Sequence, residues 1–454
     1  MPSPQGPDRE GIASLLDTDL YKLTMQCAIL HSGWGDIDVT YTYTNRTPYL
    51  KIRRSGYEWL KRQVSNLGSI TVTEGELGFL RRKCPYFPES FLEYLKNFRL
   101  KPNQEVKLEF HPVPSPREGD EDEDGNLTVT IAGSWAGTIL YEIPLLVLVS
   151  ESYFRYTDTD WDYTGQEEKA FEKGVRLLQG GCVFSEFGTR RRRSYATQEM
   201  VLRGLMKAAE EHKQNNINTG GIFSGTSNVH FAHRFDLNPI GTVAHEWFMG
   251  IAAITQNYST ANLVGLEKWL SCFGAVVLGI ALTDTFGTEQ FLKCFKRERP
   301  GTALTYAEIY TGVRQDSGDP KKLVLMMKTF YTDLEKETGR KVGRKTIVFS
   351  DSLNVDLCLR YKTFAEEFGF ATSFGIDDFE RLSCPKQKSS PLNIVIKLSS
   401  AAGRPAVKIS DNIGKNTGDK KTVEEVKQEL GYIEKTWSEE MGGEMGDEKN
   451  RWGA

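Results

Sequence analysis

The stretch TGVRQDSGDPKKLVLMMKTF, residues 311–330, contains a complete strand-to-helix unit. Its first residues are typical of a short strand, and a polar junction with a glycine connects them to an amphipathic segment that is typical of a helix. Asp319 is the expected N-cap and Pro320 the expected first helical residue. Aspartate accepts hydrogen bonds from the free N–H groups of a helix, and proline has no N–H group to leave unpaired there. The stretch therefore predicts one β-α unit.

The same unit recurs on both sides of this stretch. Strands that alternate with helices imply a parallel sheet and an α/β fold. Because each unit is polar where the strand meets the helix, we predict a (β/α) barrel whose junctions form the active site. A doubly wound open sheet is the alternative, since periodicity does not show whether a sheet closes. The recurring units are residues 180–212, 220–229, 239–256, 277–295 and 345–369, followed by a final strand at 371–376.

The pattern divides the chain into four parts. Residues 1–12 are polar and expected to be disordered, and residues 13–148 mix helical and strand patterns in an N-terminal α/β domain. Residues 149–382 contain the repeated units and form the predicted catalytic barrel. Residues 383–454 read as a hairpin, a helix and a charged tail that pack on the barrel or on the N-terminal domain.

Composition excludes several classes of protein. A net charge of -4 over 454 residues argues against a general nucleic-acid binder, whose basic surface would show in the totals. The seven cysteines are scattered, with no C-x-x-C pair, which indicates neither a disulfide framework nor a zinc site. The start has no apolar signal-peptide core, and no apolar stretch is long enough to span a bilayer. We expect a cytoplasmic protein, with a nuclear location also open, that binds neither membrane nor nucleic acid.

A dense block of positive charge, SEFGTRRRRS (185–194), occupies one of the strand-to-helix junctions. Successive side chains of an extended segment point to opposite faces, so at most two of the four arginines can enter one pocket. The others would meet carboxylates or solvent. A localisation signal is the competing interpretation, but this block follows an apolar strand and precedes a helix, a context that favours phosphate binding.

The junctions together contain arginines, hydroxyls, glycines, carboxylates and one histidine. Cations and hydroxyls beside helix N-termini bind phosphate oxygens, and glycines let backbone N–H groups approach them. Carboxylates hold Mg²⁺ or fix sugar hydroxyls. A phosphorylated sugar is the ligand class that uses all of these groups. The residues are Arg190–Arg193, Thr226–Asn228, Thr242, His245, Thr283, Asp284, Arg314, Asp316–Asp319, Ser350 and Asp351.

His245 and Arg314 carry the more specific hypotheses. His245 is expected to end an apolar strand, 239–244, where a neutral imidazole could act as base or nucleophile; a merely hydrogen-bonded histidine is equally open. Arg314 lies two residues before Asp316 and projects to the same face. A single arginine without a partner in the sequence is a reasonable seat for a substrate carboxylate.

In these motifs the chain resembles the nicotinate phosphoribosyltransferase family, and its eukaryotic, fungal-type branch most. The resemblance implies the conversion of nicotinate and phosphoribosyl pyrophosphate to nicotinate mononucleotide and pyrophosphate, the first step of NAD synthesis from nicotinate. It implies coupled hydrolysis of ATP to ADP and phosphate, a need for Mg²⁺, and a type II phosphoribosyltransferase fold, in which the (β/α) barrel is irregular. The matching stretches include LLDTDLYKLTM (15–25), NRTPY (45–49), FSEFGTRRRRS (184–194), PIGTVAHEW (239–247), GVRQDSGDP (312–320) and KISDNIGKNTGD (408–419).

The resemblance also implies roles for the site residues. Tyr21 would stack on the pyridine ring, from the same chain or from a neighbouring subunit of a homodimer. Thr242 and Arg314 would contact nicotinate, and ATP would phosphorylate His245. Asp284 and Asp351 would serve Mg²⁺ or the ribose, with no fixed metal site in the protein. The residues that would hold phosphoribosyl pyrophosphate are Gly188, Arg190, Arg191, Asp316, Ser317 and Gly318.

The sequence departs from the family at one point. After the strand that ends at Ile376 the family has a G-T-x-x-T-N-D segment that wraps a phosphate, whereas here Asp377, Asp378 and Phe379 follow directly. About six residues of that family pattern are missing, and two carboxylates stand where the phosphate loop should begin. We therefore expect weakened binding of phosphoribosyl pyrophosphate.

Three functions stay open on this basis. The first is the nicotinate enzyme; nicotinamide is a weaker substrate candidate, because it would leave Arg314 without a counter-charge. The second is a catalytically impaired homologue or isoform that lacks the phosphate loop after Ile376. The third is a nucleic-acid protein that uses the arginine block, which the net charge disfavours.

Overall fold

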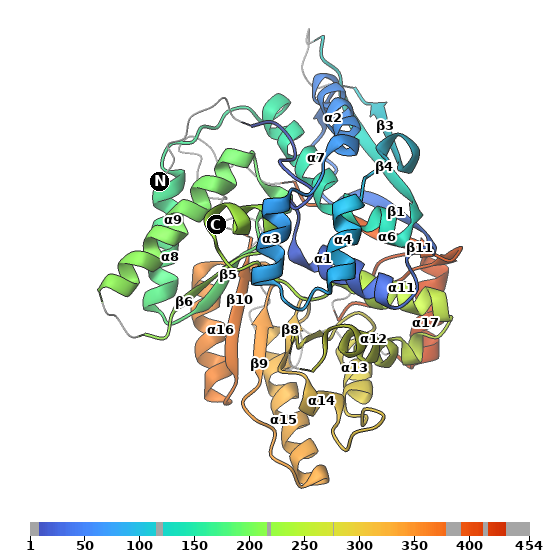
Figure 1. Ribbon diagram of the computed structural model, residues 1–454, viewed down its shortest axis with the longest axis vertical. Helices are drawn as coiled ribbons and strands as arrows, with labels where there is room; N and C mark the ends of the chain where they lie inside the picture. The colour runs from blue at the N-terminus through green and yellow to red at the C-terminus, as the bar shows by residue number, and fades with distance from the viewer. Residues whose placement is uncertain are drawn as a thin grey trace.

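The computed structural model describes residues 9–114, 121–215, 219–275, 277–377, 392–411 and 416–432. Its strands form two six-stranded sheets, one antiparallel and one parallel. In Figure 1 the strands β1, β3 and β4 of the antiparallel sheet lie above the strands β8 and β9 of the parallel sheet. The chain thus folds into two parts of different architecture, whose contact places the site described below.

The antiparallel sheet has the order β12-β11-β1-β4-β2, with β3 paired to β4. Val39, Tyr41 and Tyr43 of β1 are buried while alternate residues face outward, as the Thr/Tyr pattern of this strand predicts. β1 also pairs with β11 from the far end of the chain, Val39 opposite Ala401. The C-terminal hairpin therefore completes the N-terminal sheet. The strands are β1 (Asp38–Asn45), β2 (Ile52–Arg53), β3 (Val106–Pro112), β4 (Asp124–Ser134), β11 (Ile394–Ala401) and β12 (Arg404–Pro405).

The second sheet is parallel, with the order β6-β5-β10-β9-β8-β7. The β-α unit predicted at 311–330 is confirmed. The carboxylate of Asp319 accepts hydrogen bonds from the N–H groups of Lys321 and Lys322 at 2.8 and 3.2 Å, and Pro320 begins the helix. The strands are β5 (Val183–Glu186), β6 (Ile222–Thr226), β7 (Ile280–Leu282), β8 (Gly312–Gln315), β9 (Thr346–Phe349) and β10 (Ala371–Ile376).

The prediction of a strand at 239–244 is wrong. Only a single bridge between Thr226 and Pro239 is present there, and His245 is the first residue of a helix. The start of α1 packs against this segment: the backbone N of Tyr21 would lie 3.1 Å from a Cβ on Gly241. Because α1 occupies this place, the segment bonds partly to α1 and cannot extend the sheet.

Within the described residues, β6 and β7 end the parallel sheet and do not pair with each other. The hydrogen-bonded ladder is therefore an open one of six strands. Two parallel bridges adjoin these ends, Thr226 with Pro239 beside β6 and Phe286 with Ile409 just after β7. Irregular segments thus line the interval between the two end strands.

The helices cover both sheets, and α7 is central among them. Its apolar sequence is buried almost along its whole length, and it packs against α2 and against the turn that carries the arginine block. None of the helices in the described ranges has the length and apolar character that a membrane crossing requires. The longer helices are α1 (Leu20–His31), α2 (Arg54–Asn66), α3 (Glu74–Lys83), α4 (Glu89–Asn97), α7 (Glu142–Tyr156), α8 (Gln166–Gln179), α9 (Tyr195–Gln214), α11 (His245–Thr255), α12 (Tyr258–Phe273), α13 (Thr288–Phe295), α15 (Pro320–Thr338), α16 (Val355–Glu367) and α17 (Lys420–Leu430).

Short helical turns connect these elements. Capping explains where several of them begin: the side chain of Asn228 accepts from the N–H of Phe231, and that of Thr305 accepts from the N–H of Glu308. The turns are α5 (Pro102–Glu105), α6 (Trp135–Thr138), α10 (Val229–Phe235) and α14 (Tyr306–Ile309), with 3₁₀ turns η1 (Leu67–Ser69), η2 (Ile139–Tyr141) and η3 (Thr189–Arg191).

Candidate active site

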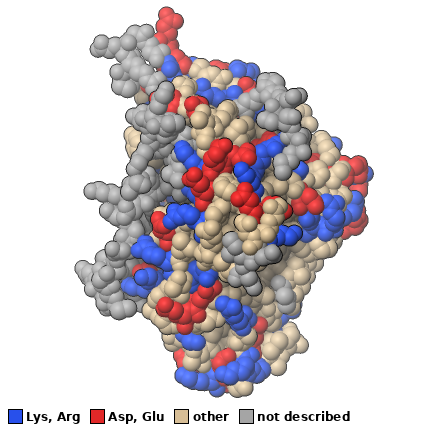
Figure 2. Space-filling model, turned by 90° about the vertical axis from the view of Figure 1, so that its left-hand side faces the viewer, with Lys and Arg blue, Asp and Glu red and all other residues tan. Residues whose placement is uncertain are grey.

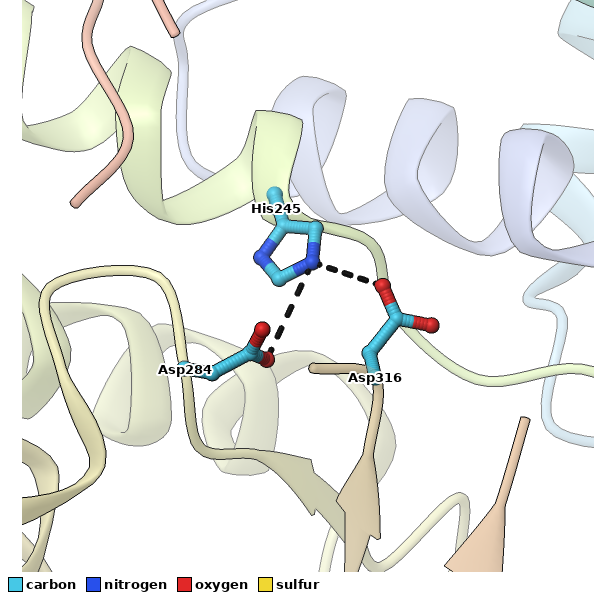
Figure 3. A group of neighbouring side chains, drawn as sticks. All are labelled: His245, Asp284 and Asp316. Carbon is cyan, nitrogen blue, oxygen red and sulfur yellow. Dashed lines mark hydrogen bonds and ion pairs between the residues drawn. The ribbon is translucent and has the colours of Figure 1, made fainter. Parts of the chain in front are cut away.

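His245, Asp284 and Asp316 come from three junctions and meet at one point (Figure 3). His245 begins α11, Asp284 follows β7, and Asp316 follows β8. The carboxyl ends of the neighbouring parallel strands β7 and β8 lie at one edge of the sheet, which brings Asp284 and Asp316 together. His245 does not follow a strand, and the segment before it is connected to β8 by the hydrogen bond from Arg314 to the carbonyl of Val243. Figure 3 shows both carboxylates directed toward the same imidazole nitrogen.

The two nitrogens of His245 face different surroundings. Nδ1 lies 3.0 Å from the hydroxyl of Thr285. Nε2 lies 2.9 Å from Oδ2 of Asp316 and 2.9 Å from the ammonium nitrogen of Lys408. A neutral imidazole can either donate to the carboxylate or accept from the ammonium at this nitrogen. Nε2 is therefore the atom that His245 presents to the charged groups of the site.

The pKa of His245 is lowered from its ordinary value. Burial is the largest cause and the positive charge of Lys408 adds to it, against the opposing effect of Asp284 and Asp316. The ring is therefore neutral near pH 7. A neutral imidazole has the free electron pair that a nucleophile or a general base requires.

Asp316 connects Arg314 to His245. Its Oδ1 accepts from Nη2 of Arg314 at 3.2 Å and from the hydroxyl of Ser350 at 2.9 Å. Burial by itself raises the pKa of Asp316, but Arg314 and His245 outweigh it and hold the pKa well below its usual range. The carboxylate stays ionised and fixes the guanidinium.

Arg314 keeps a free donor. Nη1 donates to the carbonyl of Val243 at 3.1 Å, which belongs to the irregular segment before α11. Nε is buried and has no hydrogen-bond partner among the described residues. A planar ligand with a carboxylate could accept from this nitrogen.

Lys408 was not among the predicted site residues, although it is the first residue of the quoted stretch KISDNIGKNTGD. Its ammonium donates to Oδ2 of Asp284 at 3.0 Å, and Ser317 donates to the same carboxylate oxygen. Burial opposes ionisation of Asp284, but Lys408 and His245 lower its pKa. The C-terminal hairpin thus supplies a cation to a site that is otherwise built from strand ends. No local pattern distinguishes this lysine from a surface lysine.

Further cations approach from the antiparallel sheet. Lys397 of β11 donates to the hydroxyl of Thr417 at 2.8 Å. Burial, Arg46 and Lys408 together lower the pKa of Lys397 to about 7. Repulsion between Lys397, Arg46 and Lys408 indicates a place where positive charges cluster and where an anion would bind favourably.

A resident metal ion does not fit the group shown in Figure 3. One ligand atom from each of His245, Asp284 and Asp316 lies within 4.8 Å of the others, a spacing that would suit a cation. The ammonium of Lys408 already contacts both His245 and Asp284, however. A divalent cation at the same place would meet that positive charge at short range.

The arginine block divides into two pairs. Arg192 is fully buried: Nη1 and Nη2 donate to Asp17 at 2.8 and 3.0 Å, and Nε donates to Glu151 of α7 at 3.0 Å. Arg193 is also buried and lies over the ring of Phe154 at 5.2 Å. Neither side chain can therefore bind a phosphate from solvent. On the face drawn in Figure 2, basic and acidic side chains are interspersed.

Asp17 and Glu151 respond differently to the same guanidinium. Burial raises the pKa of each, but the two bonds from Arg192 lower that of Asp17 to about 2. Glu151 receives one bond from the guanidinium and one from the backbone N–H of Gly11 at 3.2 Å, but burial prevails and its pKa rises to about 7. The guanidinium is therefore chiefly the partner of Asp17.

Arg190 and Arg191 are half-buried on the other side of the turn. Nη1 of Arg191 donates to Asp377 at 2.5 Å. Arg190 forms no hydrogen bond or ion pair with the described residues, but Tyr21 and Asp377 raise its pKa against the effect of burial. The backbone N–H of Gly188 donates to Glu186. These two arginines are the candidates for binding an anion.

Tyr21 lies on the same side of the molecule as Arg190. Its hydroxyl donates to Glu142 at 3.4 Å, and burial together with Glu142 raises its pKa well above the usual value. The next helical turn places the hydroxyl of Thr24 2.6 Å from the carbonyl oxygen of Thr242. Tyr21 and the segment before His245 are thus neighbours within one chain.

The predicted residues form two groups. His245, Asp284, Arg314, Asp316 and Ser317 are joined by direct contacts, and Gly318 follows with φ +79°. The second group comprises Tyr21, Gly188, Arg190 and Arg191. Lys397 connects the groups, because Asp316 of the first and Glu142 beside Tyr21 both act on its pKa.

Other predicted hydroxyls serve the fold. The hydroxyl of Thr226 donates to Glu186 at 2.6 Å, and that of Ser227 donates to Asp19 at 2.8 Å. Asn228 donates to Asp17 at 2.8 Å. These groups satisfy buried carboxylates and are not directed at His245. At the other junctions, Thr283 accepts from the hydroxyl of Thr288, and Asp351 accepts from that of Ser352.

The segment after Ile376, where the sequence departs from the family pattern, lies mostly outside the described residues. Asp377 is described, whereas Asp378 and Phe379 are not. Asp377 directs its carboxylate at Arg191. One of the two arginines expected to bind phosphate is therefore already paired with an acid.

Comparison with known proteins gives consistent results. A model described as "Nicotinate phosphoribosyltransferase (NAPRTase) family" matches residues 182–434, and one for the N-terminal domain of that family matches residues 16–150. The "Probable nicotinate phosphoribosyltransferase" of Schizosaccharomyces pombe is 47% identical over 92% of this chain and 98% of its own length. The nicotinate phosphoribosyltransferase of Saccharomyces cerevisiae is 44% identical over 97% and 99%.

Solved structures agree with this. The crystal structure of a Saccharomyces cerevisiae protein described as a nicotinate phosphoribosyltransferase candidate has a TM-score of 0.85 and 43% identity, and the match covers 94% of this chain and 100% of the other. That of nicotinate phosphoribosyltransferase from Porphyromonas gingivalis has a TM-score of 0.79 and 30% identity, over 92% and 100%.

Replacing Arg192 should destabilise the protein strongly. Arg192→Ala leaves Asp17 and Glu151 buried without their cation, a loss of about 3–5 kcal/mol in the free energy of unfolding. Arg192→Lys keeps the positive charge but loses the planar guanidinium that bonds both carboxylates. Its free energy of unfolding should therefore lie between those of the alanine variant and the unmodified chain. Denaturant unfolding of the purified variants measures this.

The matched control is Arg176→Ala, which removes an exposed ion pair with Asp356. It should cost less than about 1 kcal/mol. Equal losses in the Arg176 and Arg192 variants would contradict the assignment of Arg192 as a buried anchor.

Proposed function

The chain belongs to the nicotinate phosphoribosyltransferase family and transfers a phosphoribosyl group to nicotinate, and we propose that the residues described above divide this task between the two groups of the site. The pyridine nitrogen attacks C1 of the ribose while pyrophosphate leaves. Positive charge develops on the sugar and negative charge on the leaving group. Catalysis then depends mainly on positioning and on fixed charges.

Arg314 is proposed to receive the nicotinate carboxylate. The observation that carries this assignment is its buried Nε, which has no partner among the described residues while Asp316 and Val243 hold the other two nitrogens. Tyr21 would stack on the pyridine ring, and Thr242 would contact nicotinate from the adjoining segment. A neutral carboxamide would leave the guanidinium without a counter-charge, which favours nicotinate over nicotinamide.

We propose that the pyrophosphate group of phosphoribosyl pyrophosphate binds Lys397 and Lys408, which the C-terminal hairpin contributes. Burial is the largest cause of the lowered pKa of Lys397, about 7, and the positive charges of Arg46 and Lys408 add to it. An anion between them would relieve that repulsion. Mg²⁺ would enter bound to the phosphates of the substrate and neutralise part of the leaving-group charge, since the His245 group does not suit a resident metal.

Gly188, Arg190 and Arg191 are proposed to hold the phosphate on the other end of the ribose. Arg190 forms no ion pair with the described residues, although Asp377, Glu142 and Asp19 lie near enough to raise its pKa against the effect of burial. The turn at Ser317 and Gly318 follows Asp316 and would contact the sugar through backbone groups. Asp351, half-buried beside Ser350, would serve the ribose hydroxyls.

His245 is proposed to accept the phosphoryl group of ATP. Its lowered pKa keeps it neutral, and Nε2 is the atom that faces the site. A phosphorylated ring would place negative charge beside Lys408 and against Asp316. That change could favour a state that binds substrates tightly, which requires roughly 5 kcal/mol of differential affinity to shift a two-state equilibrium from one side to the other.

A catalytically impaired homologue is the second candidate. It is favoured by the ion pair between Asp377 and Arg191, because Arg191 is one of the two arginines proposed to bind phosphate. The otherwise complete set of His245, Arg314 and Lys408 favours the active enzyme. The two candidates differ in how tightly phosphoribosyl pyrophosphate binds.

An irregular barrel is proposed for the parallel sheet. The bridges Thr226–Pro239 and Phe286–Ile409 adjoin its two end strands. Arg314 also ties the 239–244 segment to β8 through Val243. These contacts support loops, rather than a seventh strand, as the closure between β6 and β7.

A cytoplasmic enzyme that works as a monomer or homodimer is proposed. Cys27, Cys84, Cys182, Cys272, Cys294 and Cys358 are free thiols, as a reducing compartment allows. Tyr21 and the segment that carries Thr242 come from one chain, so a single subunit would contain both sides of the nicotinate site.

Substitution of Arg314 should remove the preference for nicotinate. In Arg314→Leu, kcat/KM for nicotinate should fall roughly 100-fold, because a buried charge partner of the carboxylate is lost. Turnover of nicotinamide should change little. For Arg314→Lys, kcat/KM for nicotinate should lie between that of Arg314→Leu and that of the unmodified chain. Steady-state rates with both substrates measure this, with the exposed Arg344→Leu as control. A nicotinate preference that survives in Arg314→Leu would contradict the assignment.

Substitution of His245 should uncouple ATP. His245→Ala should take up no label from γ-phosphate-labelled ATP, while the exposed control His111→Ala should be labelled normally. Because the pKa of His245 is lowered from its ordinary 6.5, the imidazole stays neutral as the pH falls to that value. Labelling should therefore decline only below pH 6.5. Normal labelling of the His245→Ala protein would remove this residue from the role.

Neutralising Asp377 should tighten the binding of phosphoribosyl pyrophosphate. Asp377→Asn removes the negative charge that faces Arg191, and we expect Kd to fall about threefold to tenfold in calorimetric titration. Asp356→Asn, which breaks the exposed pair with Arg176, is the matched control and should leave Kd unchanged. A chain with the family's G-T-x-x-T-N-D segment restored after Ile376 should bind more tightly still. Unchanged affinity in both of these altered chains would show that neither the acid nor the missing segment limits binding.

A further inference from the structure

Two thiols from distant parts of the chain lie side by side between two helices. Cys27 is on α1 and Cys272 is on α12, and their Sγ atoms are 3.9 Å apart. The residues are separated by 245 positions, so only the fold brings them together. None of the catalytic roles proposed above uses either thiol.

The two thiols differ in their access to solvent. Cys27 is 2% exposed and belongs to the core, whereas Cys272 is half-buried. A small oxidant in solution therefore meets Cys272 first. Cys27 lies behind it as a thiol that only a neighbouring sulfur can reach. Redox-active pairs have this arrangement of one accessible and one resolving cysteine.

Their mutual hydrogen bond also separates their reactivity. The contact raises the pKa of Cys27, an effect that burial increases, and it lowers the pKa of Cys272 against the effect of burial. Thiolate, not thiol, is the nucleophile toward an oxidant. The more accessible sulfur is therefore also the more reactive one.

The helices are already docked at this position. His31, one turn after Cys27, has its Nε2 3.3 Å from the hydroxyl of Ser271, which precedes Cys272. Formation of a disulfide would bring the two sulfurs about 2 Å closer to each other. The contact between the helices holds the two thiols side by side before any oxidation.

We propose that Cys27 and Cys272 are a modification site, at which a peroxide forms a reversible disulfide between α1 and α12. The Cys272 thiolate attacks one peroxide oxygen, the O–O bond breaks, and a sulfenic acid and a hydroxide form; the hydroxide takes up a proton to give water. The sulfur of Cys27 then attacks that of Cys272, the S–O bond breaks, and the oxygen leaves as water with the Cys27 proton. Two thiols lose two electrons and the peroxide gains them.

The disulfide would act on the helix that supplies part of the site. Tyr21 and Lys22 lie in the first turn of α1, and α12 packs against α11, which begins with His245. A bond between α1 and α12 would restrain the movement of these two helices relative to each other. Disulfide formation itself does not depend on the proposed function, since it needs only the two sulfurs and the oxidant.

The experiment maps thiols in the full-length protein after exposure to a small molar excess of hydrogen peroxide. Free thiols are alkylated, the protein is digested, and peptides are identified by mass spectrometry with and without dithiothreitol. We expect Cys27 and Cys272 to lose their reactivity together, with one cross-linked peptide pair that dithiothreitol releases. On a non-reducing denaturing gel the oxidised chain should migrate faster, because the bond closes a long loop.

Single variants separate the roles of the two sulfurs. Cys27→Ser should prevent the cross-link and leave Cys272 to oxidise further to sulfinic acid, whereas Cys272→Ser should protect Cys27 from oxidation. Cys84→Ser is the matched control: Cys84 is buried, and both it and Cys27 lie near enough to Tyr86 to raise the pKa of that residue. Loss of the Cys84 thiol should leave the cross-link intact. A peptide that joins Cys27 to Cys84 instead, or oxidised Cys272 with Cys27 still free in the unmodified chain, would overturn the proposal.

Discussion

The fully buried guanidinium of Arg192 is the contact on which the arrangement of the site depends. It bonds Asp17, just before α1, and Glu151 of α7, so it joins two N-terminal segments to the turn after β5. A buried cation with two carboxylates tolerates little displacement, because each lost bond would leave a charge without water or partner. The turn is thereby fixed with Arg193 beneath it and with Arg190 and Arg191 on the side of Tyr21.

A second long-range contact completes the chemistry. β11 pairs with β1, and this return of the chain to the N-terminal sheet brings Lys397 and Lys408 to the ends of the parallel strands. Lys408 then contacts both His245 and Asp284. The same ammonium lowers the pKa of the histidine, disfavours a metal ion at that place, and leaves positive charge for an anionic substrate. One lysine therefore sets three properties of the site.

The sequence predicted the site best where local rules apply. Asp319 and Pro320 cap α15 as expected, because capping involves only the next few residues. Asp284 and Asp316 converge because β7 and β8 are parallel neighbours in the sheet. His245 joins them from a segment that is not a strand, so the parallel order does not account for its position. The expected strand at 239–244 failed because α1 packs against it, a contact that no local pattern contains. Lys408 was missed for the same reason.

The amino-acid sequence by itself determined the alternation of strands and helices, the polar character of their junctions and the family to which the motifs point. These properties depend on neighbours within a few residues, whose spacing is visible in the chain. Only the tertiary structure decided which arginines of a single charged run support the fold and which face the site. That division follows from burial and from partners as distant as Asp17, Glu151 and Asp377, since the energy of a charge is set by its surroundings in space.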